Sequence, residues 1–217
     1  MRLMCAASYA VKGEIVSTNQ RTVRNAALLL AGAVALGMAA YPVAAKKRTV
    51  VLAQSTFDAD DEGWVTIGDS LPIQFNQTGG NPGGFVSGED QSLGETWYFR
   101  APAKFLGNRS TAYGQTLTYD IIASAIPDDR NTADIILRSG SLTLLYRGVH
   151  LPSTGWSHFS VPLKPGKNWI LGDTRRKASA KQFKQVLANL QELDIRGEYI
   201  TGPDTEGLDN VVLNGRG

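Results

Sequence analysis

The sequence contains few of the residues that usually carry enzyme chemistry: its 217 residues include one Cys, three Met and two His. A single cysteine excludes an intrachain disulfide framework. The two histidines, His150 and His158, stand eight residues apart and show no HxxxH spacing, so no zinc-site pattern is present. The chain also lacks a G-x-S-x-G nucleophile elbow. These absences favour a protein without catalytic chemistry of its own.

Charge and hydrophobicity narrow the class further. The net charge is +2, which excludes binding of nucleic acid or another polyanion through bulk basicity. The hydrophobic fraction is 42%, with 4 Trp, 7 Tyr and 7 Phe, which excludes a disordered chain. The length suits one domain, or one domain with a tail.

The first 45 residues have the pattern of a leader. Arg21 and Arg24 precede the uncharged stretch 25–45, whose centre AALLLAGAVALGMAA (26–40) is continuously apolar and which ends in Val-Ala-Ala. This pattern predicts a secretory signal peptide over residues 1–45, cut after Ala45. The product would then be secreted, or periplasmic or extracellular, with no membrane attachment after cleavage. A retained anchor is the alternative, although the apolar core is shorter than the roughly 20 residues that span a bilayer.

Removing the leader changes the totals. Of the 22 basic residues, 18 lie after Ala45, and of the 20 acidic residues, 19 do. The predicted product therefore has a net charge of −1. Cys5 and all three Met also lie in the leader. Without disulfides, an exported domain must be held by its own core or by a metal.

The remaining chain reads as β structure. Short apolar or alternating runs, broken by Gly, Pro, Asn and Asp, predict about ten strands, with residues 46–56 leading into the first. Ser139-Gly140 predicts a hairpin turn. Strands at this spacing favour an all-β jelly-roll β-sandwich over a βαβ fold. One amphipathic helix is expected near 179–190, because Phe183, Val186, Leu187 and Leu190 share one face.

Five segments together resemble the laminin B-type domain (laminin domain IV). The segments are residues 96–121, 133–148, 156–163, 183–199 and 207–213. Their order and spacing match the family from roughly Gly79 to Leu213, which is most of the chain after the leader, and the FLGN segment with the VLANL and IRG pieces is the most specific part. The resemblance implies a galactose-binding-like jelly roll over residues 57–217. It also implies a secreted, non-catalytic module of matrix, adhesion or cell-surface proteins. Laminins embed this domain among Cys-rich repeats, which this chain lacks.

An acidic cluster predicts a cation site. Asp58 and Asp60 lie in FDADDEGW (57–64) and have EF-hand-like spacing with Asp69, but strand patterns flank them where an EF-hand needs helices. If the first and last strands pair, Asp58 approaches Asp209, and carboxylates with backbone carbonyls are the oxygen ligands that Ca²⁺ requires. We therefore expect a structural calcium site with Asp58, Asp60 and Asp209, with a solvated acidic turn as the alternative.

A sugar-binding site is the second candidate. Trp169 lies in a loop-like setting with Asn168 and Asp173, and an exposed indole beside polar groups can stack on a sugar. The alternative for Trp169 is packing under the loop. The segment TGGNPGGFVSGED (78–90) reads as a flexible Gly-rich loop without the P-loop lysine. The basic run 175–177 is expected to be a solvated face or a contact for an anionic partner.

The sequence thus predicts a monomeric, secreted binding or adhesion module whose partner is an extracellular glycan or a surface or matrix protein. Two alternatives remain: a carbohydrate-active hydrolase with the jelly roll as its cleft, and a purely structural envelope or matrix component.

Overall fold

The structure, a computed structural model, describes residues 48–91, 94–127 and 132–217. The chain divides into two units, residues 1–44 and 45–217, and the described residues belong to the second. The predicted signal peptide therefore lies outside the described residues. No described helix is long and apolar enough to cross a membrane.

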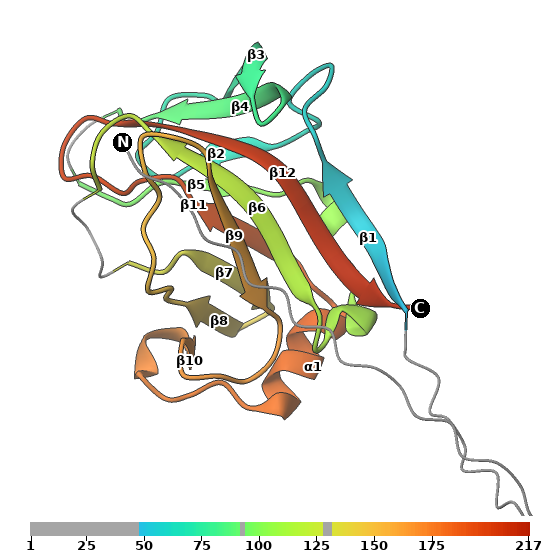
Figure 1. Cartoon of the computed structure of the whole chain (residues 1–217). Coiled ribbons are helices and arrows are strands. Elements are labelled where there is room, and N and C mark those ends of the chain that lie inside the picture. Colours follow the sequence, from blue (N-terminus) through green and yellow to red (C-terminus); the bar gives the residue numbers. More distant parts are fainter. Residues whose placement is uncertain (1–47, 92–93, 128–131) are drawn as a thin grey trace, which may run out of the picture. The chain divides into compact units, whose positions relative to one another are not determined.

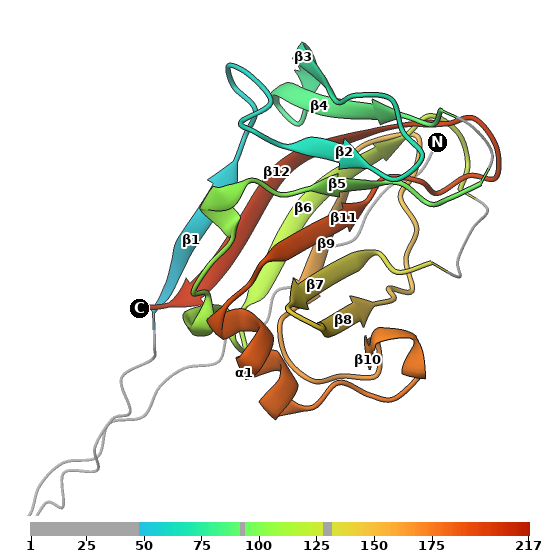
Figure 2. The ribbon, with the colours of Figure 1, turned by 180° about the vertical axis from the view of Figure 1, so that it is seen from behind.

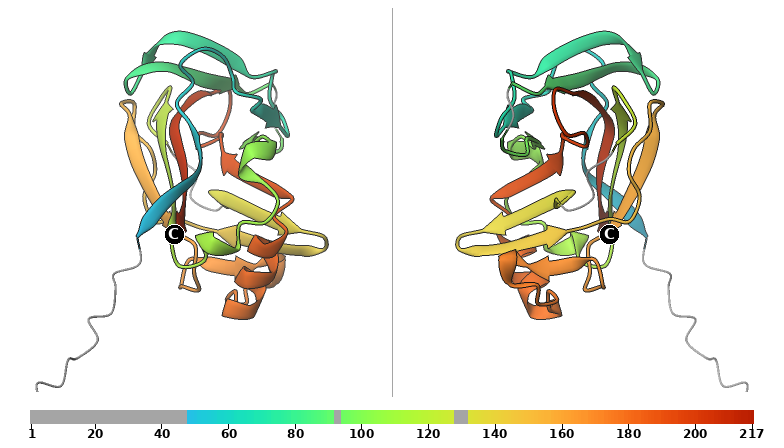
Figure 3. Two further views of the ribbon diagram at one scale, coloured as in Figure 1. Left: turned by 90° about the vertical axis from the view of Figure 1, so that its right-hand side faces the viewer. Right: turned by 90° about the vertical axis from the view of Figure 1, so that its left-hand side faces the viewer.

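Two antiparallel sheets of six strands each form a sandwich (Figures 1 and 3). Sheet A has the order β3-β4-β12-β6-β9, with β1 paired to β12. Its strands are β1 (Thr49–Ser55), β3 (Gln74–Gly80), β4 (Gly83–Glu89), β6 (Thr116–Ala123), β9 (Ser157–Pro162) and β12 (Thr205–Arg216).

Sheet B has the order β10-β8-β7-β11-β5-β2. Its strands are β2 (Val65–Ile67), β5 (Tyr98–Arg100), β7 (Ile135–Ser139), β8 (Leu142–Tyr146), β10 (Trp169–Leu171) and β11 (Glu192–Arg196). The described residues also include three 3₁₀ turns: η1 (Ala103–Phe105), η2 (Ser110–Ala112) and η3 (Gly172–Thr174). The predicted all-β sandwich with one short helix is confirmed.

Alternation along the strands builds the core. On β6, Leu117, Tyr119 and Ile121 are buried on the face that meets sheet B. Leu193 and Ile195 of β11 are buried in the same way on the opposing sheet. Residues of alternating position along a strand point to opposite faces, so each sheet presents one apolar inner face and one mixed outer face.

The helix α1 (Ala180–Ala188) begins where the sequence predicts. Ser179 Oγ accepts a hydrogen bond from Gln182 N, and Gln182 Oε1 accepts one from Ser179 N, which is a capping box. Phe183, Val186 and Leu187 are buried, and the Phe183 ring meets the Trp169 ring edge-on at 5.0 Å. The helix therefore closes one end of the sandwich over β10 (Figure 1).

The sequence predicts a flexible loop for the glycine-rich segment 78–90, and this prediction is wrong. The segment forms the end of β3, the turn and β4 of a hairpin. Its glycines allow close approach: a Cβ on Gly84 would lie 2.2 Å from the Phe57 carbonyl oxygen, and one on Gly88 would lie 2.5 Å from the Trp97 ring. The glycines thus mark sites where other groups pack against the strand, not sites of flexibility.

The interior also holds a buried acid. Glu206 of β12 is fully buried, and burial, followed by repulsion from Asp204, raises its pKa to about 10. A carboxyl group with this pKa keeps its proton at neutral pH. Its burial therefore does not place a second negative charge beside Asp204.

Candidate functional site

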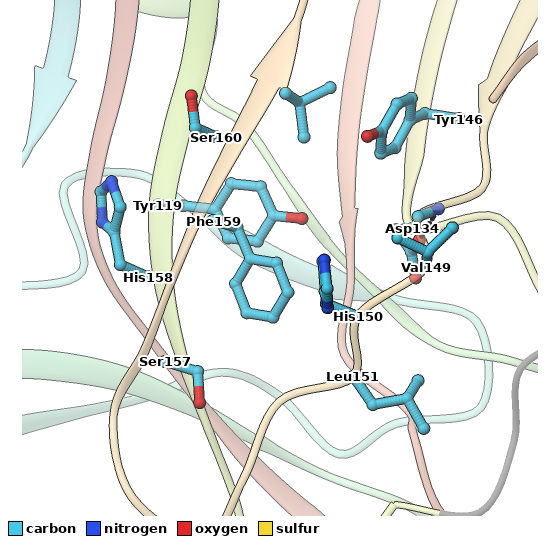
Figure 4. A pocket seen from close by; sticks show the side chains of 12 residues that line it. Tyr119, Asp134, Tyr146, Val149, His150, Leu151, Ser157, His158, Phe159 and Ser160 are labelled. Atoms are coloured by element: carbon cyan, nitrogen blue, oxygen red, sulfur yellow. Dashed lines mark hydrogen bonds between the residues drawn. The ribbon is translucent and has the colours of Figure 1, made fainter. Parts of the chain in front are cut away.

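A pocket of about 250 Å³ opens between β9 and the chain that follows β8 (Figure 4). Tyr119 comes from β6, and residues 157–161 come from β9. Residues 148–151 form the opposite wall. The full lining is Tyr119, Asp134, Tyr146, Gly148, Val149, His150, Leu151, Ser157, His158, Phe159, Ser160 and Val161.

Aromatic rings form one wall of this pocket. The register of β6 and β9 places Tyr119 opposite Phe159, and their rings stack at 5.3 Å with an interplanar angle of 11°. Figure 4 shows these rings beside His150. Tyr119 is buried, which raises the pKa of its phenol well above the ordinary value, so the hydroxyl stays protonated. Phe159 is half-buried and exposes part of its ring to the pocket.

Asp134 supplies a fixed carboxylate on the other side. It lies just before β7, is 7% exposed, and accepts a hydrogen bond from Gly148 N. Its other oxygen lies 3.7 Å from Nη1 of Arg196. A Cβ on Gly148 would lie 2.8 Å from Asp134 Oδ2, so only glycine leaves room for this contact. The site combines a rigid aromatic wall with an oriented hydrogen-bond acceptor.

On the outer face of sheet A, His158 and Asp120 form a pair. His158 Nδ1 lies 2.6 Å from Asp120 Oδ1, and Asp120 Oδ2 accepts hydrogen bonds from the side-chain amides of Asn81 and Asn210. Ser157 points to the opposite side of β9 and contacts Ser153 instead. Asp120 thus ties the tip of the β3–β4 hairpin to β6 and β12.

The first and last strands pair, as predicted, and bring the acidic edge together. β1 runs antiparallel to β12 with Ser55 opposite Val211, so Asp58 and Asp209 lie at the same end of the pair. Asp209 is fully buried and accepts hydrogen bonds from Asn81 N and Asn210 N. Burial first, then the charges of Asp120 and Asp58, raise its pKa.

Asp60 and Asp58 both accept hydrogen bonds from groups close to them in the sequence. Asp60 Oδ1 accepts a hydrogen bond from Glu62 N at 2.8 Å, within its own turn, while Asp58 Oδ2 accepts one from Thr56 Oγ1 at 2.7 Å. Among the described residues, no group of three or more His, Cys, Asp or Glu side chains stands close enough to share a metal ion. The calcium site stays a prediction.

Trp169 does not offer the exposed face that its predicted role requires. The indole is 1% exposed, packs against Tyr146 and Phe183, and its Nε1 donates to the Pro162 carbonyl. Asn168 beside it donates to the Tyr146 hydroxyl. Asp173 belongs to η3, and its side chain lies outside the described part. The prediction that Trp169 is a sugar-stacking platform is therefore wrong. The indole packs in the core because helix α1 covers it.

Sequence reasoning missed Phe159 and Asp134. The alternation of Phe159 with Val161 in WSHFSVPL was available as a signal for an inward-facing ring. Asp134 had no local signal, because its contacts to Gly148 and Arg196 arise only when β7, β8 and β11 pair.

Solved structures confirm the architecture. The L4b domain of human laminin alpha-2 superposes with a TM-score of 0.59 at 12% identity, covering 76% of this chain and 98% of that one. The family 11 carbohydrate-binding module from Clostridium thermocellum, in complex with a β-1,3-1,4-mixed-linked tetrasaccharide, superposes with a TM-score of 0.50 at 11% identity, covering 76% and 96%. At these identities the likeness establishes the jelly-roll sandwich and nothing finer.

The sequence comparison is more specific. Human laminin subunit gamma-2 is 33% identical over 171 residues, which cover 73% of this chain and 13% of that protein. The chain therefore matches a small part of a much longer relative. The family described as Laminin B (Domain IV) matches residues 98–215, which is more than half of the chain. This protein belongs to the laminin B (domain IV) family.

Proposed function

We propose that the protein is a secreted, non-catalytic binding module that takes a neutral sugar unit in the pocket between β9 and residues 148–151. The relationship to laminin supports an extracellular setting, and the leader-like sequence 1–45 supports export. The observation that carries the proposal is the stacked Tyr119–Phe159 pair facing a fixed Asp134 in one pocket.

The chemistry of the pocket suits a sugar ring. A sugar presents apolar C–H faces to an aromatic ring and hydroxyl groups to acceptors, and Phe159 and Asp134 supply these two complementary groups. The volume of about 250 Å³ lies just below the range of about 300–1,000 Å³ typical of drug-sized ligands. That size suits one ring of a glycan whose other units extend into solvent.

The carboxylate content of the pocket favours binding over hydrolysis. Glycoside hydrolysis by the usual route needs two carboxyl groups on opposite sides of the bond. Of the described residues that line the pocket, Asp134 alone carries a carboxylate, and Gly148 and Arg196 already engage it. An oriented, charge-balanced carboxylate is suited to accepting a hydrogen bond from a sugar hydroxyl.

The experiment is a glycan array followed by calorimetry on the hits, with the purified protein and two variants. Phe159→Ala removes the stacking ring, and we expect sugar binding to weaken about tenfold or more, which corresponds to 1.4 kcal/mol. Phe85→Ala is the matched control, because this ring is also half-buried but meets Trp156 edge-on and does not line the pocket. Equal effects of the two variants would contradict the proposal.

Two further measurements on the same protein distinguish the two alternatives. Turnover of a chromogenic glycoside that is lost in Asp134→Asn would identify a hydrolase. The absence of any glycan hit, together with self-association of the protein, would identify a structural matrix component.

We also propose that the edge between β1 and β12 holds a structural Ca²⁺ ion, with Asp58 and Asp209 as ligands. Both carboxylates lie against the β3–β4 hairpin: a Cβ on Gly80 would lie 2.8 Å from Asp209 Oδ2, and one on Gly83 would lie 3.7 Å from Asp58 Oδ1. The Phe57 carbonyl oxygen also faces this hairpin, as its approach to Gly84 shows. Carboxylate and carbonyl oxygens are the donors that Ca²⁺ prefers.

Thermal unfolding with and without a chelator tests the calcium proposal. We expect EDTA to lower Tm by several degrees and added Ca²⁺ to restore it, because the ion binds only the folded state. Asp58→Asn should abolish the response, while Asp60→Asn should weaken it less, since Asp60 already bonds within its own turn. An unchanged Tm on chelation would remove the proposal.

A further inference from the structure

The outer face of sheet B carries a second hollow, a groove of about 420 Å³. This face is turned toward the viewer in Figure 2. Strands β5, β7 and β8 form the floor of the groove, and η3 borders one side. Its lining residues are Tyr98, Thr132, Ala133, Ile136, Arg138, Thr143, Leu145, Arg147 and Gly172.

The charged side chains among the described residues that line this groove are all positive. Among the described residues that line the groove there are two arginines, Arg138 and Arg147, and no carboxylate. Tyr98 adds a hydroxyl donor, because burial raises its pKa to about 12 and keeps the phenol protonated. The groove therefore presents mainly hydrogen-bond donors with positive charge.

Neighbouring carboxylates hold part of this surface in place without neutralising all of it. Arg138 Nη1 lies 3.2 Å from Glu192, and its Nε donates to Thr143 Oγ1. Glu192 and Asp194 also bind Arg100. Arg147 is exposed, and none of the ion pairs between described side chains includes it. With respect to the described side chains, the positive charge of Arg147 is thus available to a ligand.

The positive surface continues beyond the groove into the loop after η3. Arg175, Arg176 and Lys177 are exposed. This loop is fixed against β10, because Leu171 N donates to the Arg176 carbonyl and Ile170 forms a bridge with Lys177. The run from Asp173 to Lys177 has a net charge of +2. Gly172 lines the groove, so the basic loop begins at its border.

We infer that the groove and the basic loop form a binding surface for an acidic polysaccharide, one that carries carboxylate or sulfate groups. Guanidinium groups bind such planar or multi-oxygen anions through two parallel hydrogen bonds. A recessed groove admits a single extended chain, whereas a membrane surface would meet only its rim. The ligand binds here through charge, separately from the neutral-sugar pocket, whose lining includes Asp134.

The test compares heparin, hyaluronan and neutral dextran as probes for the purified full chain by calorimetry. We expect binding of heparin that weakens as salt rises, weaker binding of hyaluronan and none of dextran, because screening acts on exposed charge pairs. Arg147→Glu should weaken heparin binding tenfold or more, and Arg175→Ala with Arg176→Ala should also weaken it. Arg48→Glu is the matched control, since it makes the same charge change at an exposed site before β1.

Two outcomes would overturn the inference. One is equal loss of heparin binding in Arg147→Glu and Arg48→Glu. The other is Arg147-dependent binding to phosphatidylserine vesicles without binding to heparin, which would identify a membrane contact instead. Phe159→Ala should leave heparin binding unchanged, so failure of the groove and failure of the sugar pocket are distinguishable.

Discussion

The pocket beside β9 and the groove on sheet B are hollows of the same sandwich with opposite chemistry. The pocket extends into the interior, where Tyr119 is 1% exposed and a single carboxylate is fixed by Gly148. The groove lies on an outer face, and the described residues that line it include Arg138 and Arg147 and no acid. The difference follows from the alternation of side chains along the strands, because the pocket draws mainly on inward-facing residues and the groove on outward-facing ones.

The largest expected difference between the two hollows is in stability. Tyr119→Ala removes a buried ring that stacks on Phe159, so we expect the free energy of unfolding to fall by about 3–5 kcal/mol. Thr143→Ala in the groove removes one partly exposed hydroxyl and should cost about 1 kcal/mol or less. Urea unfolding of both variants measures the contrast. A loss of similar size at both positions would mean that the groove is also part of the core.

A second contrast concerns the protonation of glutamate side chains on the inner and outer faces of the sheets. The folded state holds the Glu206 proton up to a pKa of about 10, whereas an ordinary Glu loses it near 4.5. The unfolded chain therefore binds fewer protons between these values, and stability falls as pH rises, by up to about 1.4 kcal/mol per pH unit.

Urea unfolding at pH 5 and pH 9 measures this decline, and Glu206→Gln should reduce it because an amide of similar shape has no proton to lose. Glu192→Gln on the outer face, where Arg100 and Arg138 already pair with the carboxylate, is the control that should leave the decline in place. The same pH dependence in wild type and Glu206→Gln would contradict the assignment.

A third contrast tests the geometry of the pocket. In Gly148→Ala the added Cβ would meet Asp134 Oδ2 at 2.8 Å, so the carboxylate must shift. We expect sugar binding to weaken severalfold, while heparin binding in the groove stays as in wild type. Calorimetry with the sugar and with heparin measures both affinities. A parallel loss of both would indicate general misfolding.

The smallest expected effect is the response of the groove to alkaline pH. Tyr98, with a pKa of about 12, keeps its proton to pH 10, and arginine keeps its charge there as well. Heparin affinity should therefore stay constant within about a factor of two between pH 7 and pH 10, a change of less than about 0.5 kcal/mol. A clear loss near pH 9 would show that a different group carries the binding.

Several elements of the fold followed from local patterns. The helix start at Ser179 and its buried face were predictable because capping and helical periodicity are properties of adjacent residues. The turn at Ser139-Gly140 was predictable for the same reason, and Gly140 adopts φ 56° there. The hairpin in 78–90 was missed, because glycines that admit Phe57 and Trp97 look like flexible glycines until the partners are known.

The candidate sites depended on contacts between residues that lie far apart in the sequence. The approach of Asp58 to Asp209 was predictable only through the expected pairing of the first and last strands. Trp169 was assigned to an exposed loop because nothing next to it in the sequence shows that α1 covers it. Arg147 and Arg138 carried no signal, since their shared groove arises from the pairing of β7 with β8.

The sequence by itself predicted a leader-like segment, the all-β class, the helix near 179–190 and the family resemblance, because each depends on residue patterns within short segments of the chain. Only the tertiary structure decided which aromatic rings are exposed, which carboxylates are paired and where positive charge stays uncompensated. The physical reason is that burial and charge neutralisation depend on neighbours in space. In a sandwich those neighbours are set by strand order, which places Asp120 beside Asn210 and Asp134 beside Arg196.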